Sequence, residues 1–247
     1  MNLYEKCVQD ELAKWRNEIY KSDNLVERTS KAIQKKTSRL IPQKVQNMLT
    51  QTIEKLVETV IFGSGLLTVY EDTHDLSLAE RDFLVLRQFK AYKKAAIAGG
   101  FGIGMGGILV GLADLPVLIS IKIKFLFDCA KLYGYDTDLK SERMFILYIF
   151  QLAFSSRAHR VDSYKVIENW DGQPMDEVNW ERFQIEYRDY IDFAKLLQLV
   201  PVIGSAVGAT ANNSLMKRLL VNAMNAYRMR YLKQNEESKV KIDDCLL

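Results

Sequence analysis

Apolar residues recur every three or four positions along almost the whole chain. In the first such stretch they are Tyr4, Val8, Leu12, Trp15 and Ile19. In a later one, which follows Pro42, they are Val45, Leu49, Ile53, Leu56 and Val60. This spacing is that of an amphipathic helix, and proline is favoured in the first turn of a helix. Because no stretch alternates as a strand would, the sequence predicts an all-α fold, a multi-helix bundle.

Local signals predict where several helices begin and end. Ser22-Asp23-Asn24 favours the start of a second helix. Residues 77–80 (SLAE) form a capping-box pattern, after which Phe83, Leu86, Phe89 and Tyr92 follow at helical spacing. Tyr133-Gly134 is a stop signal, and the apolar run from Ser141 predicts a buried helix.

The C-terminal third is predicted to hold two helices of different character. Residues 176–199 predict an acidic amphipathic helix that is interrupted at Pro201. A last helix is expected from about Ser205 to Lys233. With no clear linker elsewhere, we expect one helical domain over residues 1–235 and a mobile tail over 236–247.

Residues 95–113 are the most unusual segment, with 19 uncharged residues that include seven of the 13 glycines. As a helix this segment would be about 28 Å long, close to the roughly 30 Å of a bilayer's hydrocarbon core. Each glycine costs a helix in water about 1 kcal/mol relative to alanine. Close packing of the glycines against a neighbouring helix or lipid would offset that cost.

The glycines are spaced for close helix packing, which predicts a glycine-rich apolar helical hairpin over residues 95–121. Asp114 would lie near its bend, where it is also a candidate N-cap for a helix starting at Leu115. Residues 196–216 form a second uncharged segment. The candidates for membrane or lipid contact are Gly100, Gly102, Gly104, Gly106, Gly107, Gly111, Asp114, Pro116, Pro201, Gly204 and Gly208. A membrane-contacting hairpin, a buried core hairpin and a permanent membrane span remain open.

The charges are unevenly distributed, although the net charge is only +3. No acidic residue lies between Asp192 and Glu236, whereas residues 168–192 are strongly acidic. Basic residues near an anionic bilayer favour binding. The candidates for contact with anionic headgroups are Lys93, Lys94, Lys122, Lys124, Lys217, Arg218, Arg228 and Arg230. Alternatively, the acidic and basic helices pair with each other. A charge of +3 is too small to indicate nucleic acid binding.

The sequence predicts neither a metal site nor a cofactor. Three cysteines and two histidines at wide spacing exclude a disulfide framework and a zinc constellation. Residues 102–107 match G-x-G-x-x-G, but a dinucleotide site needs that turn between a strand and a helix. Residues 71–75 combine three carboxylates with His74 and could bind a divalent cation, although such runs are usually solvated loops.

Several stretches of the sequence resemble the EcsC family of bacterial proteins. The stretches are SLAERDFLVLRQFKAYKKAAIAGG, GMGGILVGLADLPVLISIKIKFLFDCAKLYGYDT, ERMFILYIFQLAFSS, FQIEYRDYIDFAKLLQLVPVIGS and NAMNAYRMRYL, over most of residues 77–232. The resemblance implies a link to the Ecs ABC transporter, whose ATPase and membrane subunit are encoded in the same operon. It implies no catalytic residues. Without a Walker motif the chain is not that ATPase, and with so few apolar segments it is not the permease.

These observations favour an accessory, membrane-associated protein without catalytic activity of its own. It would contact membrane lipid, with the Ecs transporter subunits as further partners. Since the N-terminus lacks the apolar core of a secretory signal, we expect a cytoplasmic protein at the inner face of the cell membrane. Two alternatives remain, a lipid-binding carrier and a lipid-acting enzyme that uses Asp114 or the acids around His74.

Overall fold

The computed structural model describes residues 2–21, 43–62, 73–101, 115–155, 157–170, 187, 191 and 206–245. In this part of the chain there are seven helices and no strand, only an isolated antiparallel bridge between Ser155 and Ile191. The helices are α1 (Leu3–Tyr20), α3 (Gln43–Phe62), α4 (Leu78–Phe101), α6 (Leu115–Leu132), α7 (Lys140–Phe154), α8 (Arg157–Glu168) and α11 (Ala206–Cys245). The all-α prediction is confirmed.

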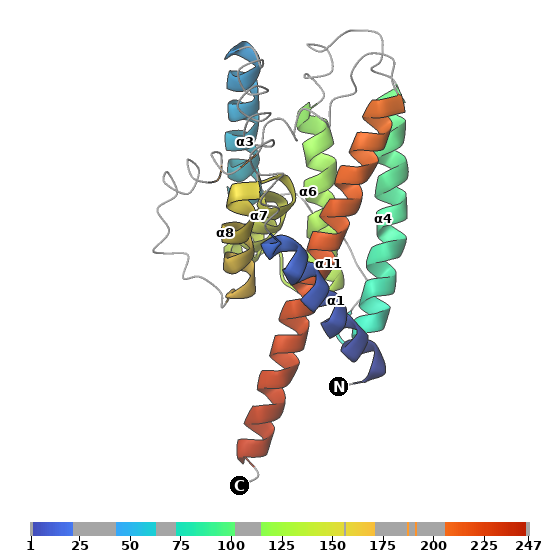
Figure 1. Ribbon diagram of the computed structural model, residues 1–247, viewed down its shortest axis with the longest axis vertical. Coiled ribbons are helices and arrows are strands. Elements are labelled where there is room, and N and C mark those ends of the chain that lie inside the picture. Colours follow the sequence, from blue (N-terminus) through green and yellow to red (C-terminus); the bar gives the residue numbers. More distant parts are fainter. Residues whose placement is uncertain are drawn as a thin grey trace.

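Helix α7 lies at the centre of the core. Seven of its residues have no exposed surface, namely Phe145, Ile146, Leu147, Ile149, Phe150, Leu152 and Phe154. It is covered by α3, α6, α8 and α11 (Figure 1). A helix that is apolar on all sides must be buried on all sides, which is why the apolar run after Ser141 correctly predicts an interior helix.

Helices α4, α6 and α11 run side by side, and α1 crosses α11 (Figure 1). Helix α4 is antiparallel to its two neighbours. Asp82 near its start bonds Tyr133 just past the end of α6, while Tyr92 higher up bonds Asp128 within α6. Residues 102–114, which connect the end of α4 to the start of α6, lie outside the described part of the chain.

A buried polar cluster at Asp82, whose side chain is 2% exposed, joins α1, α4, α11 and the residue just past the end of α6. Its carboxylate accepts hydrogen bonds from Tyr4 (2.6 Å), from Tyr133 and from Nε of Arg228 (2.9 Å). Arg228 also pairs with Glu11 on α1 (2.8 Å). Burial, followed by the hydrogen bond to Asp82, raises the pKa of Tyr4 to about 12.

Helix ends follow local rules, some visible in the sequence. The Ser77 hydroxyl accepts from the Glu80 amide (3.4 Å), and the Glu80 carboxylate accepts from the Ser77 amide (2.8 Å), which confirms the capping box. The Ser77 hydroxyl also donates to the Glu80 carboxylate (2.6 Å), and this bond, followed by the one from the Ser77 amide, holds the pKa of Glu80 below its usual value. A second capping box, between Asn2 and Glu5, starts α1 and was not predicted.

Gly134 ends α6 in a left-handed conformation (φ 89°), as its place in the stop signal predicts. The amide of Tyr135 bonds the Ala130 carbonyl (3.0 Å) and the amide of Gly134 bonds the Lys131 carbonyl (2.8 Å). A Cβ at Gly134 would lie 2.7 Å from a guanidinium nitrogen of Arg81. Arg81 is buried and bonds the Leu76 carbonyl (2.9 Å), so it cannot easily move.

Gly134→Ala is therefore expected to lower the free energy of unfolding by about 2–4 kcal/mol. The positive φ alone costs a side-chain-bearing residue roughly 1–2 kcal/mol, and the contact with Arg81 adds to it. Urea unfolding followed by circular dichroism measures the change. A loss below about 0.5 kcal/mol, the usual size for a surface change, would contradict this account of Gly134.

The last helix is longer than predicted. It continues to Cys245, whereas the sequence suggested an end near Lys233. Residues 234–244 contain neither glycine nor proline, so no residue there ends the helix. The final turns of α11 extend beyond the other helices (Figure 1). The division into one domain and a mobile tail stays a prediction.

Several predicted elements fall outside the described residues. These are the helix expected from Ser22-Asp23-Asn24 and most of the acidic helix over 176–199. From the latter, Tyr187 is described and buried, and its hydroxyl donates to the Leu147 carbonyl (2.9 Å). No helix among the described residues is both long enough and apolar enough to cross a membrane.

Candidate functional site

Most of the candidates for membrane or lipid contact lie outside the described residues. Gly102, Gly104, Gly106, Gly107, Gly111, Asp114, Pro201 and Gly204 belong to this group. The middle of the predicted hairpin, residues 102–114, therefore lies outside the described residues, whereas its two ends belong to α4 and α6. Gly100 lies in the last turn of α4, and Gly208 lies in the first turn of α11. Pro116 lies in the first turn of α6, where its side chain is exposed.

Three basic candidates are turned inward and are held by the chain itself. Arg228 pairs with Asp82 and Glu11, as described above. Arg230 forms a two-pronged pair with Glu142 (2.7 and 2.6 Å), and its guanidinium lies 4.0 Å from the ring centre of Tyr135. Among the alternatives, the structure favours intramolecular pairing for these arginines, although their partners come from helices other than the acidic segment.

Lys122 is the third, with no exposed surface. Its ammonium donates only to the Leu118 carbonyl (3.3 Å), and no carboxylate among the described residues pairs with it. Burial lowers the pKa of Lys122 to about 7. A lysine in this position cannot contact a headgroup unless the bundle opens.

The other basic candidates lie toward one end of the bundle. Lys94 and Lys217 are exposed, while Lys93 and Arg218 are half-buried. Lys124 pairs with Asp128 on the same helix (3.5 Å). Lys93 lies eleven residues after Asp82, and Lys217 lies eleven residues before Arg228. Asp82 and Arg228 are paired across the antiparallel helices α4 and α11. Lys93 and Lys217 are each about three helical turns from this pair in the same direction, so they lie at the same height along the bundle.

The solvent-facing side of α4 combines apolar and basic side chains. Phe83 is 64% exposed and Leu86 is 43% exposed. Arg87, Lys90 and Lys94 are exposed on the same side of the helix. We call these five residues the α4 outer face. Core contacts of α4 are made instead by Val85 and Phe89, which lie on the opposite side of the helix.

No acidic residue interrupts this basic region along α4 and α11. Residues 83–101 and 206–235 contain no aspartate or glutamate. The buried carboxylate of Asp128, on α6, accepts from Tyr92 (2.5 Å) and Gln88 (3.1 Å) and is directed into the α4–α6 contact. The α4 outer face therefore carries three exposed cations and no carboxylate of its own, with Glu80 one turn before Phe83, although the chain as a whole carries only +3.

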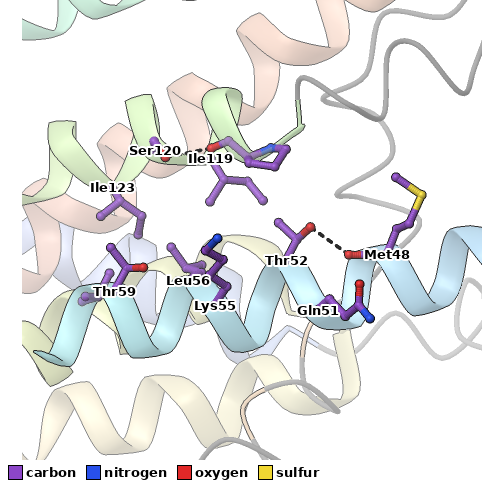
Figure 2. A pocket seen from close by; sticks show the side chains of 11 residues that line it. Met48, Gln51, Thr52, Lys55, Leu56, Thr59, Ile119, Ser120 and Ile123 are labelled. Atoms are coloured by element: carbon purple, nitrogen blue, oxygen red, sulfur yellow. Dashed lines mark hydrogen bonds between the residues drawn. The ribbon is translucent and has the colours of Figure 1, made fainter. Parts of the chain in front are cut away.

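A groove lies between α3 and the start of α6, on another side of the molecule. It encloses about 410 Å³, within the range of small-molecule sites. Figure 2 shows side chains from both helices directed into the space between them. The lining residues are Met48, Gln51, Thr52, Lys55, Leu56, Thr59, Val60, Pro116, Ile119, Ser120 and Ile123. Helix α3 packs mainly against α7, which leaves its contact with α6 short.

The described residues offer binding surfaces rather than a metal centre. They contain no group of three or more histidine, cysteine or acidic residues that could hold a metal ion. His74 lies in the turn before α4, and part of the acidic run beside it is not described. An apolar groove and an exposed basic-apolar helix face are both suited to amphiphiles, which bury hydrocarbon and present charge.

The sequence did not predict that the residues of the α4 outer face are exposed. Phe83 and Leu86 have the spacing of a core stripe, and Arg87 and Lys90 were not singled out. A helical wheel of α4 does show basic residues beside them, which was the available signal. The groove gives no signal in the sequence, because α3 and α6 are far apart along the chain and their apolar stripes are those of core helices.

Comparisons with known proteins agree with one another. The model of the EcsC protein family matches residues 6–232. Protein EcsC of Bacillus subtilis (strain 168) is 41% identical over 229 residues, which are 93% of this chain and 97% of that protein. Uncharacterized protein YdbA of the same organism is 30% identical over 167 residues, 65% of this chain and 61% of that protein. No solved structure matches.

The family match extends from the fourth residue of α1 to the middle of α11. It thus takes in the α4 outer face, the α3–α6 groove and all of the Asp82 cluster except Tyr4. The chain belongs to the EcsC protein family.

Proposed function

We propose that this chain is an accessory protein of an Ecs-type ABC transport system that works at the cytoplasmic face of the membrane. Family membership supports the link to the transporter. The observation that supports contact with the membrane is the α4 outer face, where Phe83 and Leu86 are exposed among Arg87, Lys90 and Lys94. The transporter subunits are then partners met at the bilayer surface.

The α4 outer face has the two features of a helix that binds at a bilayer interface. Its apolar side chains can enter the boundary between headgroups and acyl chains, and its basic side chains can contact anionic headgroups. Each cation near an anionic surface contributes about 1 kcal/mol. Lys217 on the neighbouring α11 lies toward the same end of the bundle and adds to the positive field.

Replacing Lys90 and Lys94 by glutamine is expected to weaken binding to anionic liposomes about thirtyfold, since two cations contribute about 2 kcal/mol. Flotation of the full chain with phosphatidylglycerol-containing liposomes at low and high salt measures the change. We expect binding to fall as salt rises, because exposed charges are screened. Neutral phosphatidylcholine liposomes should bind weakly.

The matched control is Lys6→Gln with Lys14→Gln, which removes two exposed lysines from α1. It changes the net charge equally, so only the place of the charges differs. If both double variants lose binding to the same degree, net charge and not the α4 outer face is responsible. If wild-type protein does not float with anionic liposomes at low salt, direct lipid contact is wrong.

A further inference from the structure

The groove between α3 and α6 has the wall chemistry of a hydrocarbon site. Its aliphatic lining residues include Leu56 and Val60 from α3 and Ile119 and Ile123 from α6, all of which are buried. Met48 lies at one end, where its flexible thioether can adapt to a ligand. A volume of about 410 Å³ suits a single chain rather than a large ring system.

Two of the three hydroxyl groups in the lining, those of Thr52 and Ser120, are hydrogen-bonded within the chain, and Thr59 is the third. Thr52 donates to the Met48 carbonyl (2.8 Å), and Ser120 donates to the Pro116 carbonyl (2.8 Å). Both bonds are made within the residue's own helix, one turn back. These side chains therefore have their hydroxyl hydrogens occupied, and a ligand along the groove meets mainly carbon.

One cation lies at the mouth of this groove. Lys55 is exposed, and Figure 2 shows it reaching from α3 toward α6. No carboxylate in the described part of the chain pairs with it. Among the described lining residues it is the only charged group, so the groove combines apolar walls with a single positive charge at its edge.

We propose that the α3–α6 groove binds a long-chain fatty acid, with the acyl chain between the two helices and the carboxylate at Lys55. The charge at the mouth selects an anionic head, and the narrow apolar volume selects one chain. This site is separate from the α4 outer face and does not depend on the proposed membrane contact. It would let the protein carry an acyl group as well as dock on a bilayer.

Binding of hexadecanoate to the full chain, measured by isothermal titration calorimetry without detergent or vesicles, tests the proposal. We expect one fatty acid per chain. Each methylene removed should weaken binding about fourfold, the usual effect of burying one CH₂ less. Lys55→Met should weaken the acid by up to about fivefold, as for an exposed ion pair, and leave the methyl ester unchanged.

Ser120→Trp fills the groove from α6 and should abolish binding. Val117→Trp is its matched control, because Val117 lies on the same helix, is 59% exposed and does not line the groove. Thermal unfolding of both variants shows whether they remain folded.

Four results would overturn the proposal. The first is no hexadecanoate binding by the wild-type chain. The second is equal loss in both tryptophan variants while both remain folded. The third is an affinity that does not depend on chain length. The fourth concerns the lipid source: if monomeric dipalmitoyl phosphatidylglycerol binds the groove and hexadecanoate does not displace it, the site belongs to a phospholipid and not to a fatty acid. Flotation with fatty-acid-free liposomes tests the α4 outer face separately.

Discussion

Arg228→Met is expected to lower the free energy of unfolding by about 3–5 kcal/mol, the usual cost of removing one partner from a buried ion pair. Arg228 bonds the Asp82 carboxylate at 2.9 Å, and that carboxylate is almost completely buried. Without the guanidinium, the negative charge keeps only its bonds from Tyr4 and Tyr133. Urea unfolding monitored by circular dichroism measures the loss.

A double-mutant cycle separates the pair from simple packing. Adding Asp82→Asn to Arg228→Met removes the buried charge that the single change leaves behind, so the double variant should recover part of the lost stability. Glu11→Gln is the control, because Glu11 contacts the same guanidinium but its side chain is 57% exposed. It should cost less than about 1 kcal/mol. If the Glu11 and Arg228 variants lose equal stability, the Asp82 pair is not the dominant contact.

Lys122→Met is expected to raise the free energy of unfolding by about 4 kcal/mol at pH 7. The lysine is fully buried without a counter-ion in the described structure, and methionine has a similar shape without the charge. The pKa of Lys122 falls from 10.5 in an ordinary environment to about 7 in the folded chain. The protein therefore contains a buried amine at a large cost in stability.

The pH dependence of this gain has a definite sign. Between about pH 7 and 10.5 the unfolded chain holds a proton on Lys122 that the folded chain has released. The contribution of Lys122 to the free energy of unfolding should therefore rise with pH across this window, and the advantage of Lys122→Met should shrink. Burial also raises the pKa of the Cys129 thiol, which opposes the rise equally in both proteins, so the difference between the two curves carries the test. Chemical unfolding from about pH 7 to 9.5 measures both curves before the tyrosines of the unfolded chain titrate.

Lys217→Met is the matched control, since it removes an exposed lysine from α11. Its stability curve should run parallel to that of the wild type over the same pH range. Parallel curves for Lys122→Met and the wild type would mean that Lys122 keeps an ordinary titration in the folded chain. A loss of stability at pH 7 would mean that the ammonium has a favourable role that its surroundings do not explain.

Sequence signals predicted the helices well where a helix depends on interactions between residues close together in the chain. The apolar stripe of α1, from Val8 to Ile19, faces the protein core, and the capping box at Ser77 and Glu80 starts α4. Gly134 ends α6 in the conformation that glycine favours. The apolar run in α7 has no polar face at all, so burial on every side was the only stable outcome.

Local signals failed where the choice depended on a neighbour. Phe83 and Leu86 share helical spacing with Phe89, but only the last is buried, because α4 meets α6 and α11 on one side alone. The pairing of Arg228 with Asp82 joins residues 146 positions apart, and no spacing rule predicts it. The same applies to the groove, whose two walls are separated by more than fifty residues.

The sequence by itself determined the helical class, several helix limits and the family, because each depends on residue type, short-range spacing or resemblance along the chain. The tertiary structure decided which charges are buried and which can meet a partner. Arg228, Arg230 and Lys122 are similar to Lys94 and Lys217 as letters in a sequence, yet the first three are turned into the bundle and the last two are exposed. Burial is set by the helices that pack on either side, and that information exists only once the chain has folded.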